Sequence, residues 1–113
     1  MKKLLACLLV AMCSVANAIG NGYQDIVKIE LHDSGHVKLY LADYQHNETC
    51  MTTGWEKVII LDKNYAHFER MYSMALTALA SNRQIFVHIN GCVDVWGNGS
   101  KYGPKAITMV VKQ

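Results

Sequence analysis

Proline is scarce and charged residues are few in this chain of 113 residues. Proline occurs once, and Asp, Glu, Lys and Arg together make up 18%, whereas apolar residues make up 51%. Disordered chains have the opposite balance, so the composition indicates a folded protein. No apolar run is long: residues 4–12 form a stretch of nine, short of the roughly 18–20 that a bilayer-spanning helix needs. The chain length corresponds to one domain.

The first 18 residues have the features of a cleaved secretory signal peptide. Lys2 and Lys3 form a positive start, residues 4–12 are apolar, and residues 16–18 (Ala-Asn-Ala) have the small-x-small pattern before a cleavage site. The alternative of a membrane anchor is disfavoured by the short apolar run. A lipoprotein is disfavoured because Cys13 follows Met12 and not a small residue. The sequence therefore predicts an exported protein, periplasmic or secreted, with residues 19–113 as its single domain.

Removal of the predicted signal peptide changes the net charge and the number of cysteines of the chain that folds. Removing 18 residues from 113 leaves 95, with nine basic residues against nine acidic ones. A neutral chain argues against a nucleic-acid partner, because binding phosphates needs a cationic surface. Two cysteines remain, and in an exported chain we expect a Cys50–Cys92 disulfide. It would close a loop of about 40 residues, a constraint worth roughly 4 kcal/mol.

Alternating apolar and polar residues predict strands. In residues 25–32, Val27, Ile29 and Leu31 alternate with charged residues, and residues 36–43 repeat the pattern after a turn at Gly35. These two segments predict a β-hairpin. Three more strands are predicted over residues 57–61, 84–90 and 105–112. Residues 44–56 and 94–104 are polar or glycine-rich and are predicted to be loops.

Apolar residues spaced three and four apart predict one amphipathic helix over residues 62–81. The predicted buried stripe consists of Phe68, Met71, Tyr72, Ala75, Leu76 and Leu79. We expect Asp62 or Asn64 to cap the start of the helix, and Asn82 to take the left-handed conformation after its end. Met74 lies off the stripe and is expected on an outer face.

The element order β-β-β-α-β-β predicts a mainly β fold with one helix. Five strands with a helix between the third and fourth indicate an OB-fold-like Greek-key barrel. The alternative is an open α+β sandwich, in which the helix packs on one face of an antiparallel sheet.

Three segments of the chain resemble the B subunits of bacterial AB5 toxins, especially the subtilase cytotoxin B-subunit group. They are residues 26–32, residues 71–82, and residues 85–92 together with Trp96 and residues 102–107. The resemblance implies an OB barrel, ring assembly as a pentamer, and glycan binding. Two positions depart from it: Gln24 aligns with a serine of the glycan-binding members, and Ile89 aligns with a tyrosine. The fold can therefore carry over without the sugar site.

Aromatic residues in the predicted loops are the candidate ligand-binding residues. They are Trp55, Trp96, Tyr44 and Tyr102, because aromatic side chains on OB-fold loops stack on sugars or bases. The alternative is that the two tryptophans cover the ends of the barrel.

No pattern in the sequence points to catalysis, a cofactor or a metal. His32 and His36 flank the first turn, but a metal site would need a third ligand such as His46. We therefore expect a non-enzymatic exported binding module whose partner is a glycan or a protein surface, and which is a pentamer or a monomer. The alternative is a periplasmic accessory or inhibitor-type protein that binds another protein and no sugar.

Overall fold

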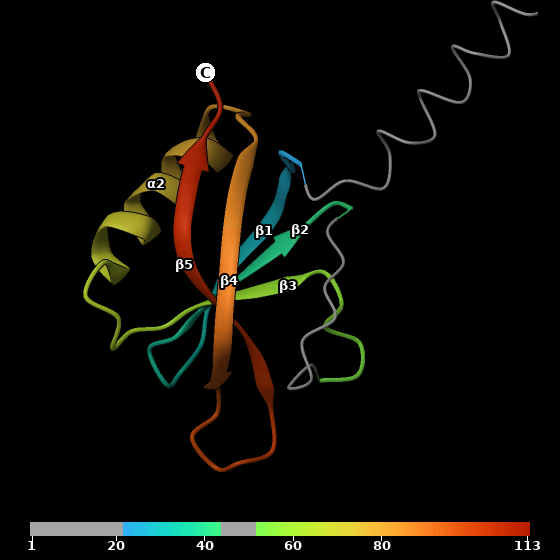
Figure 1. Cartoon of the computed structure of the whole chain (residues 1–113), viewed down its shortest axis with the longest axis vertical. Coiled ribbons are helices and arrows are strands. Elements are labelled where there is room, and N and C mark those ends of the chain that lie inside the picture. The colour runs from blue at the N-terminus through green and yellow to red at the C-terminus, as the bar shows by residue number, and fades with distance from the viewer. Residues whose placement is uncertain (1–21, 44–51) are drawn as a thin grey trace, which may run out of the picture.

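The computed structural model describes residues 22–43 and 52–113. In this part of the chain, five strands and one helix follow the predicted order. They are β1 (Ile26–Leu31), β2 (Val37–Leu41), β3 (Val58–Leu61), α2 (Phe68–Ala80), β4 (Ile85–Asp94) and β5 (Tyr102–Val111). The prediction of a mainly β fold with a single helix after the third strand is confirmed (Figure 1).

The strands form one five-stranded sheet in the order β1-β2-β3-β5-β4. Neighbouring strands are antiparallel except β3 and β5, which are parallel and pair between Ile60 and Lys105. The long β4–β5 ribbon crosses in front of the three shorter strands (Figure 1). The predicted hairpin of β1 and β2 is present, and its turn contains Gly35 with φ of 95°.

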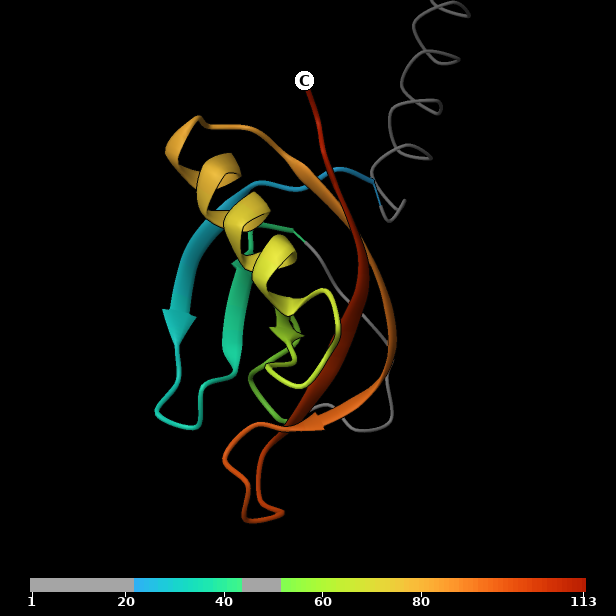
Figure 2. The ribbon, with the colours of Figure 1, turned by 90° about the vertical axis from the view of Figure 1, so that its left-hand side faces the viewer.

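The sheet is not closed, so the predicted barrel is wrong and the open alternative is confirmed. Among the described residues, the two edges of the sheet meet at one isolated bridge, between Gln24, which precedes edge strand β1, and Ile85 of edge strand β4. Beyond that bridge α2 packs against β1, β3 and β5 (Figure 2). Met71, Ala75 and Ala78 of the helix are buried in the main core. The helix thus covers apolar surface that further strand pairing would otherwise cover.

The helix is shorter than the sequence predicts and is rotated about its axis. Residues 62–67 form turns, and Asp62 accepts the N–H of Asn64 in place of capping the helix. The predicted N-terminal cap, Asp62 or Asn64, is therefore wrong, and His67 precedes the first helical residue. Leu76 and Leu79 of the predicted stripe are exposed, while Met74 packs on the core. Asn82 does adopt the predicted left-handed conformation, with φ of 56°.

Apolar residues on both faces of β3 make it the centre of the molecule. Ile59 and Leu61 belong to the main core, and Val58 and Ile60 belong to a second, smaller cluster on the opposite face. A short apolar run is what a strand covered on both sides requires. The second cluster is completed by buried Val93 and Val95, with partly buried Tyr40 and Trp55 packed against it. This cluster supports the end of the molecule where β4 turns into β5.

Candidate functional site

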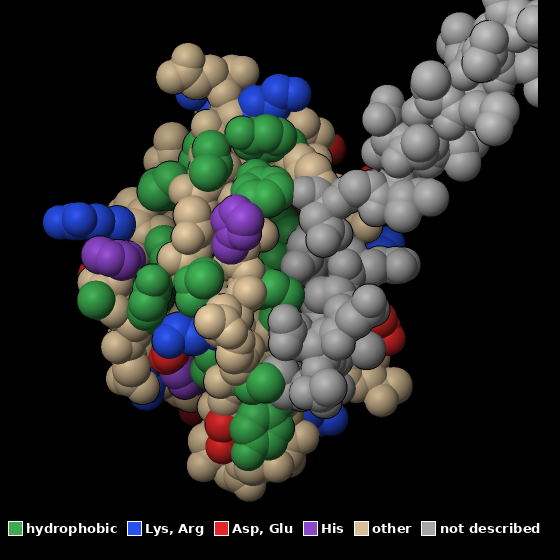
Figure 3. All heavy atoms as spheres, in the orientation of Figure 1, with side chains coloured by type: hydrophobic (Ala, Val, Ile, Leu, Met, Phe, Trp, Pro, Cys, Tyr) green, Lys and Arg blue, Asp and Glu red, His purple; other side chains and the backbone are tan. Residues whose placement is uncertain are grey.

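An exposed ring and a half-buried ring stack at the end of the molecule formed by the β4–β5 loop, residues 95–101, and the β1–β2 turn, residues 32–36. Trp96 is 44% exposed. Its ring lies nearly parallel to that of His32, with 6.0 Å between the ring centroids and an interplanar angle of 11°. We call Trp96 and His32 the aromatic platform. Figure 3 shows hydrophobic side chains at the surface of this lower end.

Hydrogen bonds from Ser34 hold the two halves of the aromatic platform together. The Ser34 hydroxyl donates to the carbonyl of Val95 at 2.6 Å, which ties the β1–β2 turn to the residue before Trp96. The Ser34 N–H donates to Nδ1 of His32 at 3.0 Å and fixes the orientation of that ring. The loop backbone before Trp96 and the ring of His32 are therefore held in place before any ligand arrives, which lowers the entropic cost of binding.

Asp94 shapes the loop that carries Trp96. One carboxylate oxygen accepts the N–H of Gly97 at 3.2 Å, and the other accepts the N–H of Gly99 at 2.9 Å. Both glycines have positive φ, 75° and 77°, a conformation that side chains disfavour. The loop is closed at its base by the N–H of Val95, which donates to the carbonyl of Lys101 at 2.9 Å.

Polar groups border the aromatic platform. The ammonium of Lys101 lies 5.5 Å from the centroid of the Trp96 ring. Tyr102 is 38% exposed, and its hydroxyl lies beside Gly99 in the same loop. Thr52 fixes the backbone of Tyr102, because its hydroxyl oxygen accepts the Tyr102 N–H at 3.0 Å and its hydroxyl donates to the Tyr102 carbonyl at 2.8 Å. Of the four predicted ligand-binding residues, the structure thus places Trp96 in the β4–β5 loop and Tyr102 at the start of β5, beside Gly99 of that loop.

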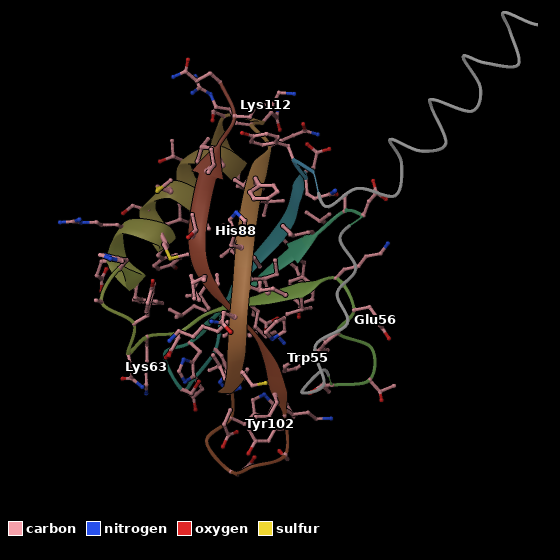
Figure 4. All side chains as sticks on the ribbon, in the orientation of Figure 1. Trp55, Glu56, Lys63, His88, Tyr102 and Lys112 are labelled. Atoms are coloured by element: carbon pink, nitrogen blue, oxygen red, sulfur yellow. The ribbon has the colours of Figure 1, made fainter. Side chains whose placement is uncertain are left out.

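Trp55 has a different environment. It is half-buried against the second hydrophobic cluster, and its ring lies next to the backbone of Gly103. The Lys38 ammonium lies 4.4 Å from the Trp55 ring centroid and covers it. Figure 4 shows Trp55 beside the lower part of β5, and Tyr102 below it at the end of the molecule. Trp55 therefore has a covering role, which is closer to the alternative that the tryptophans cover apolar residues than to the prediction of ligand binding.

A charged cluster beside Trp55 was not found by sequence reasoning. Lys38 is only 6% exposed, and its ammonium lies 3.2 Å from a carboxylate oxygen of Glu30. Burial alone would lower the pKa of Lys38, but hydrogen bonds with Tyr40 and Glu30 outweigh it and raise that pKa. The hydrogen bond from Lys38 also lowers the pKa of Glu30. Strand alternation correctly puts Lys38 on the face opposite the main core, but it does not show that Trp55 covers that face.

Two predicted residues fall on segments outside the described ones. Tyr44, the fourth candidate for ligand binding, lies in residues 44–51, as does Cys50 of the predicted disulfide. Cys92 is in β4, where it is opposite Pro104 of β5. The Cys50–Cys92 pairing therefore stays a prediction.

His32 and Ser34 were not among the predicted site residues. Both belong to the short β1–β2 turn, where the sequence singles out His32 only as a possible metal ligand and gives no role to Ser34. The signal that could have found them is the pairing of a histidine with a hydroxyl residue at a strand end, but this points to Trp96 only when the position of the β4–β5 loop is known.

No family model, curated protein or solved structure matches this chain. Among the described residues, no helix combines the length and apolarity needed to cross a membrane.

Proposed function

We propose that the chain is an exported, non-enzymatic binding module that holds a glycan on the aromatic platform. The observation that supports this is the exposed ring of Trp96, stacked on the half-buried ring of His32, with a hydrogen bond that joins the β4–β5 loop to the β1–β2 turn. A sugar ring has an apolar C–H face that packs on an aromatic ring and hydroxyls that need polar partners. The ammonium of Lys101, 5.5 Å from the Trp96 ring centroid, supplies such a partner, and the hydroxyl of Tyr102 lies beside Gly99 of the same loop.

A glycan array with the folded protein tests this proposal. We expect binding to one group of related glycans, and Trp96→Ala should remove it. Tyr23→Ala is a matched control, because Tyr23 is 41% exposed and lies near the opposite end of β4, next to the bridge between Gln24 and Ile85. An array without signal for the folded wild-type protein, or equal loss in both variants, would contradict the proposal.

The alternative, a protein partner or a second copy of this chain, is supported by a different observation. Edge strand β1 carries two large apolar side chains that are mostly exposed, Val27 at 64% and Leu31 at 61%. Exposed apolar residues on an unpaired edge favour association with another strand. Light scattering after size-exclusion chromatography tests self-association. A stable pentamer that Leu31→Lys dissociates would support ring assembly, whereas a monomer at micromolar concentration would remove it.

Export remains part of the proposal, because the predicted signal peptide lies in residues outside the described ones. The N-terminal sequence of the protein recovered from the periplasm or the medium tests it. We expect that sequence to begin at Ile19, after the Ala-Asn-Ala pattern. A protein that retains Lys2 and Lys3 would contradict cleavage.

A further inference from the structure

A buried histidine, His36, ends the turn that carries half of the aromatic platform. His36 directly precedes β2 and is 6% exposed. Its Nδ1 accepts the backbone N–H of Lys63 at 3.2 Å, so the neutral ring carries its proton on Nε2. A carboxylate oxygen of Asp62 lies 3.6 Å from the same Nδ1. His36 therefore stands between a backbone donor and an acidic acceptor.

Protonation of His36 would replace the hydrogen bond from the Lys63 N–H with one to the Asp62 carboxylate. An imidazolium has a hydrogen on Nδ1 and cannot accept the Lys63 N–H, but it can donate to the Asp62 carboxylate. The charged groups that face His36 are Asp62, Lys63, His32 and Asp94. Asp62 and Asp94 favour the protonated ring and the other two oppose it, while burial has the largest effect and lowers the pKa of His36. The neutral ring is therefore favoured, and His36 gains its proton at a lower pH than an ordinary histidine does.

Lys63 connects this exchange to the aromatic platform. Its ammonium donates to the carbonyl of Ser34, and its side chain runs closely past Gly35, where an added Cβ would lie 3.0 Å from Cδ of Lys63. Ser34 is also the residue whose hydroxyl holds Val95 and whose N–H orients His32. A displacement of Lys63 would thus move Ser34, and through Ser34 it would affect both His32 and the loop that carries Trp96.

We infer that His36 is a pH-sensitive latch: its protonation releases the backbone of Lys63, loosens the hold of Ser34 on the β4–β5 loop, and disorders the aromatic platform. That ligand release would follow in acid rests on the proposed function. The latch itself does not, because it can be observed on the protein without any ligand.

Nuclear magnetic resonance of the unliganded protein between pH 8 and pH 5 tests the latch. The probes are the backbone amide of Lys63, the indole N–H of Trp96 and the ring of His36. We expect all three to titrate together with one midpoint below about 6.5. His36→Asn places an amide oxygen where Nδ1 accepts the Lys63 N–H and cannot titrate, so the transition should disappear from Lys63 and Trp96.

Two further variants separate the latch from local effects. Ser34→Ala removes the hydroxyl that holds Val95, so Lys63 should still titrate while the Trp96 response is largely lost. His32→Gln tests direct titration of the neighbouring ring, and the Trp96 response should survive it. A Trp96 response that persists in His36→Asn, or that disappears in His32→Gln while Lys63 still titrates, would overturn the latch.

The wild-type protein provides a measurement that needs no variant. If His36 titrates while the Lys63 amide stays unchanged, the latch is wrong even where His36→Asn fails to fold. Because none of these signals requires a glycan, a silent array together with a coupled titration would reject the proposed function and keep the latch. If His36, Lys63 and Trp96 titrate together but glycan binding is the same at pH 7.5 and pH 5.5, only the claim that acid releases the ligand would be rejected.

Discussion

The side chain of Ile60 packs directly on the backbone of Gly103, where β3 and β5 run side by side. A Cβ added to Gly103 would lie 2.6 Å from Cγ1 and 3.0 Å from Cδ1 of Ile60. Ile60 is fully buried, so its side chain has no free space to move into. This close approach seats β5 on β3, and the Trp55 ring packs against the same glycine.

Gly103→Ala should therefore destabilise the protein. We expect a loss of about 1–3 kcal/mol in the free energy of unfolding, the usual effect of forcing extra volume into a packed core. Urea unfolding followed by circular dichroism measures it. Gly22→Ala is the matched control, because nothing lies within 4 Å of an added Cβ there, and its effect should stay within about 0.5 kcal/mol. The double variant with Ile60→Val should recover part of the loss, and an unchanged stability of Gly103→Ala would contradict the packing described.

The ion pair of Lys38 and Glu30 should show coupling in a double-mutant cycle. Glu30→Gln leaves a buried ammonium without its carboxylate, whereas Lys38→Met removes that charge and keeps most of the apolar stem. The double variant should thus be less destabilised than the sum of the single ones. Because the Glu30 side chain is 40% exposed, we expect a coupling near 1 kcal/mol, the upper end for pairs reached by solvent. Strictly additive effects on urea unfolding would show that the pair contributes no coupling.

Local patterns in the sequence predict much of this fold. The β1–β2 hairpin follows from alternation and a glycine turn, and β3 follows from a short apolar run. Both signals lie within a few residues of the chain. The start of α2 is missed because the carboxylate of Asp62 accepts the N–H of Asn64 in a turn before the helix. Asp side chains form such turns as readily as they cap helices, so the sequence does not distinguish the two. Closure of the sheet is missed because it depends on how far β1 and β4, distant in sequence, pair with each other.

The candidate site is predictable only in part for the same reason. Trp96 and Tyr102 are recognisable as aromatic residues of a glycine-rich loop. Their neighbours His32 and Ser34 come from the other end of the chain and meet the loop only because β3 lies beside β5 in the sheet. The distinction between exposed Trp96 and half-buried Trp55 likewise depends on Lys38 and Gly103, which no local pattern connects with Trp55.

The predicted Cys50–Cys92 disulfide can be tested by mass. The protein isolated under non-reducing conditions should weigh two hydrogens less than after reduction, and alkylation without reductant should label neither cysteine. Reduction should lower the free energy of unfolding by up to about 4 kcal/mol, because the bridge constrains a long loop of the unfolded chain. Two thiols labelled in the native protein would show that the pairing is wrong.

Stability should also depend on pH through His36. Burial lowers the pKa of His36 in the folded protein, while in the unfolded chain it takes up a proton near pH 6.5. The unfolded state then binds more protons, so stability falls as the pH drops below about 6.5 and stops falling at the lower pKa of the folded state. The lowered pKa of Glu30 also makes stability fall with falling pH, but at lower pH, below the ordinary glutamate pKa of 4.5.

Urea midpoints at pH 7.5 and pH 5.5 measure the effect of His36. The wild-type protein should lose stability between them, His36→Asn should lose less, and His88→Asn, at an exposed histidine of β4, should behave as the wild type. An equal loss in wild type and His36→Asn would assign the dependence to another group.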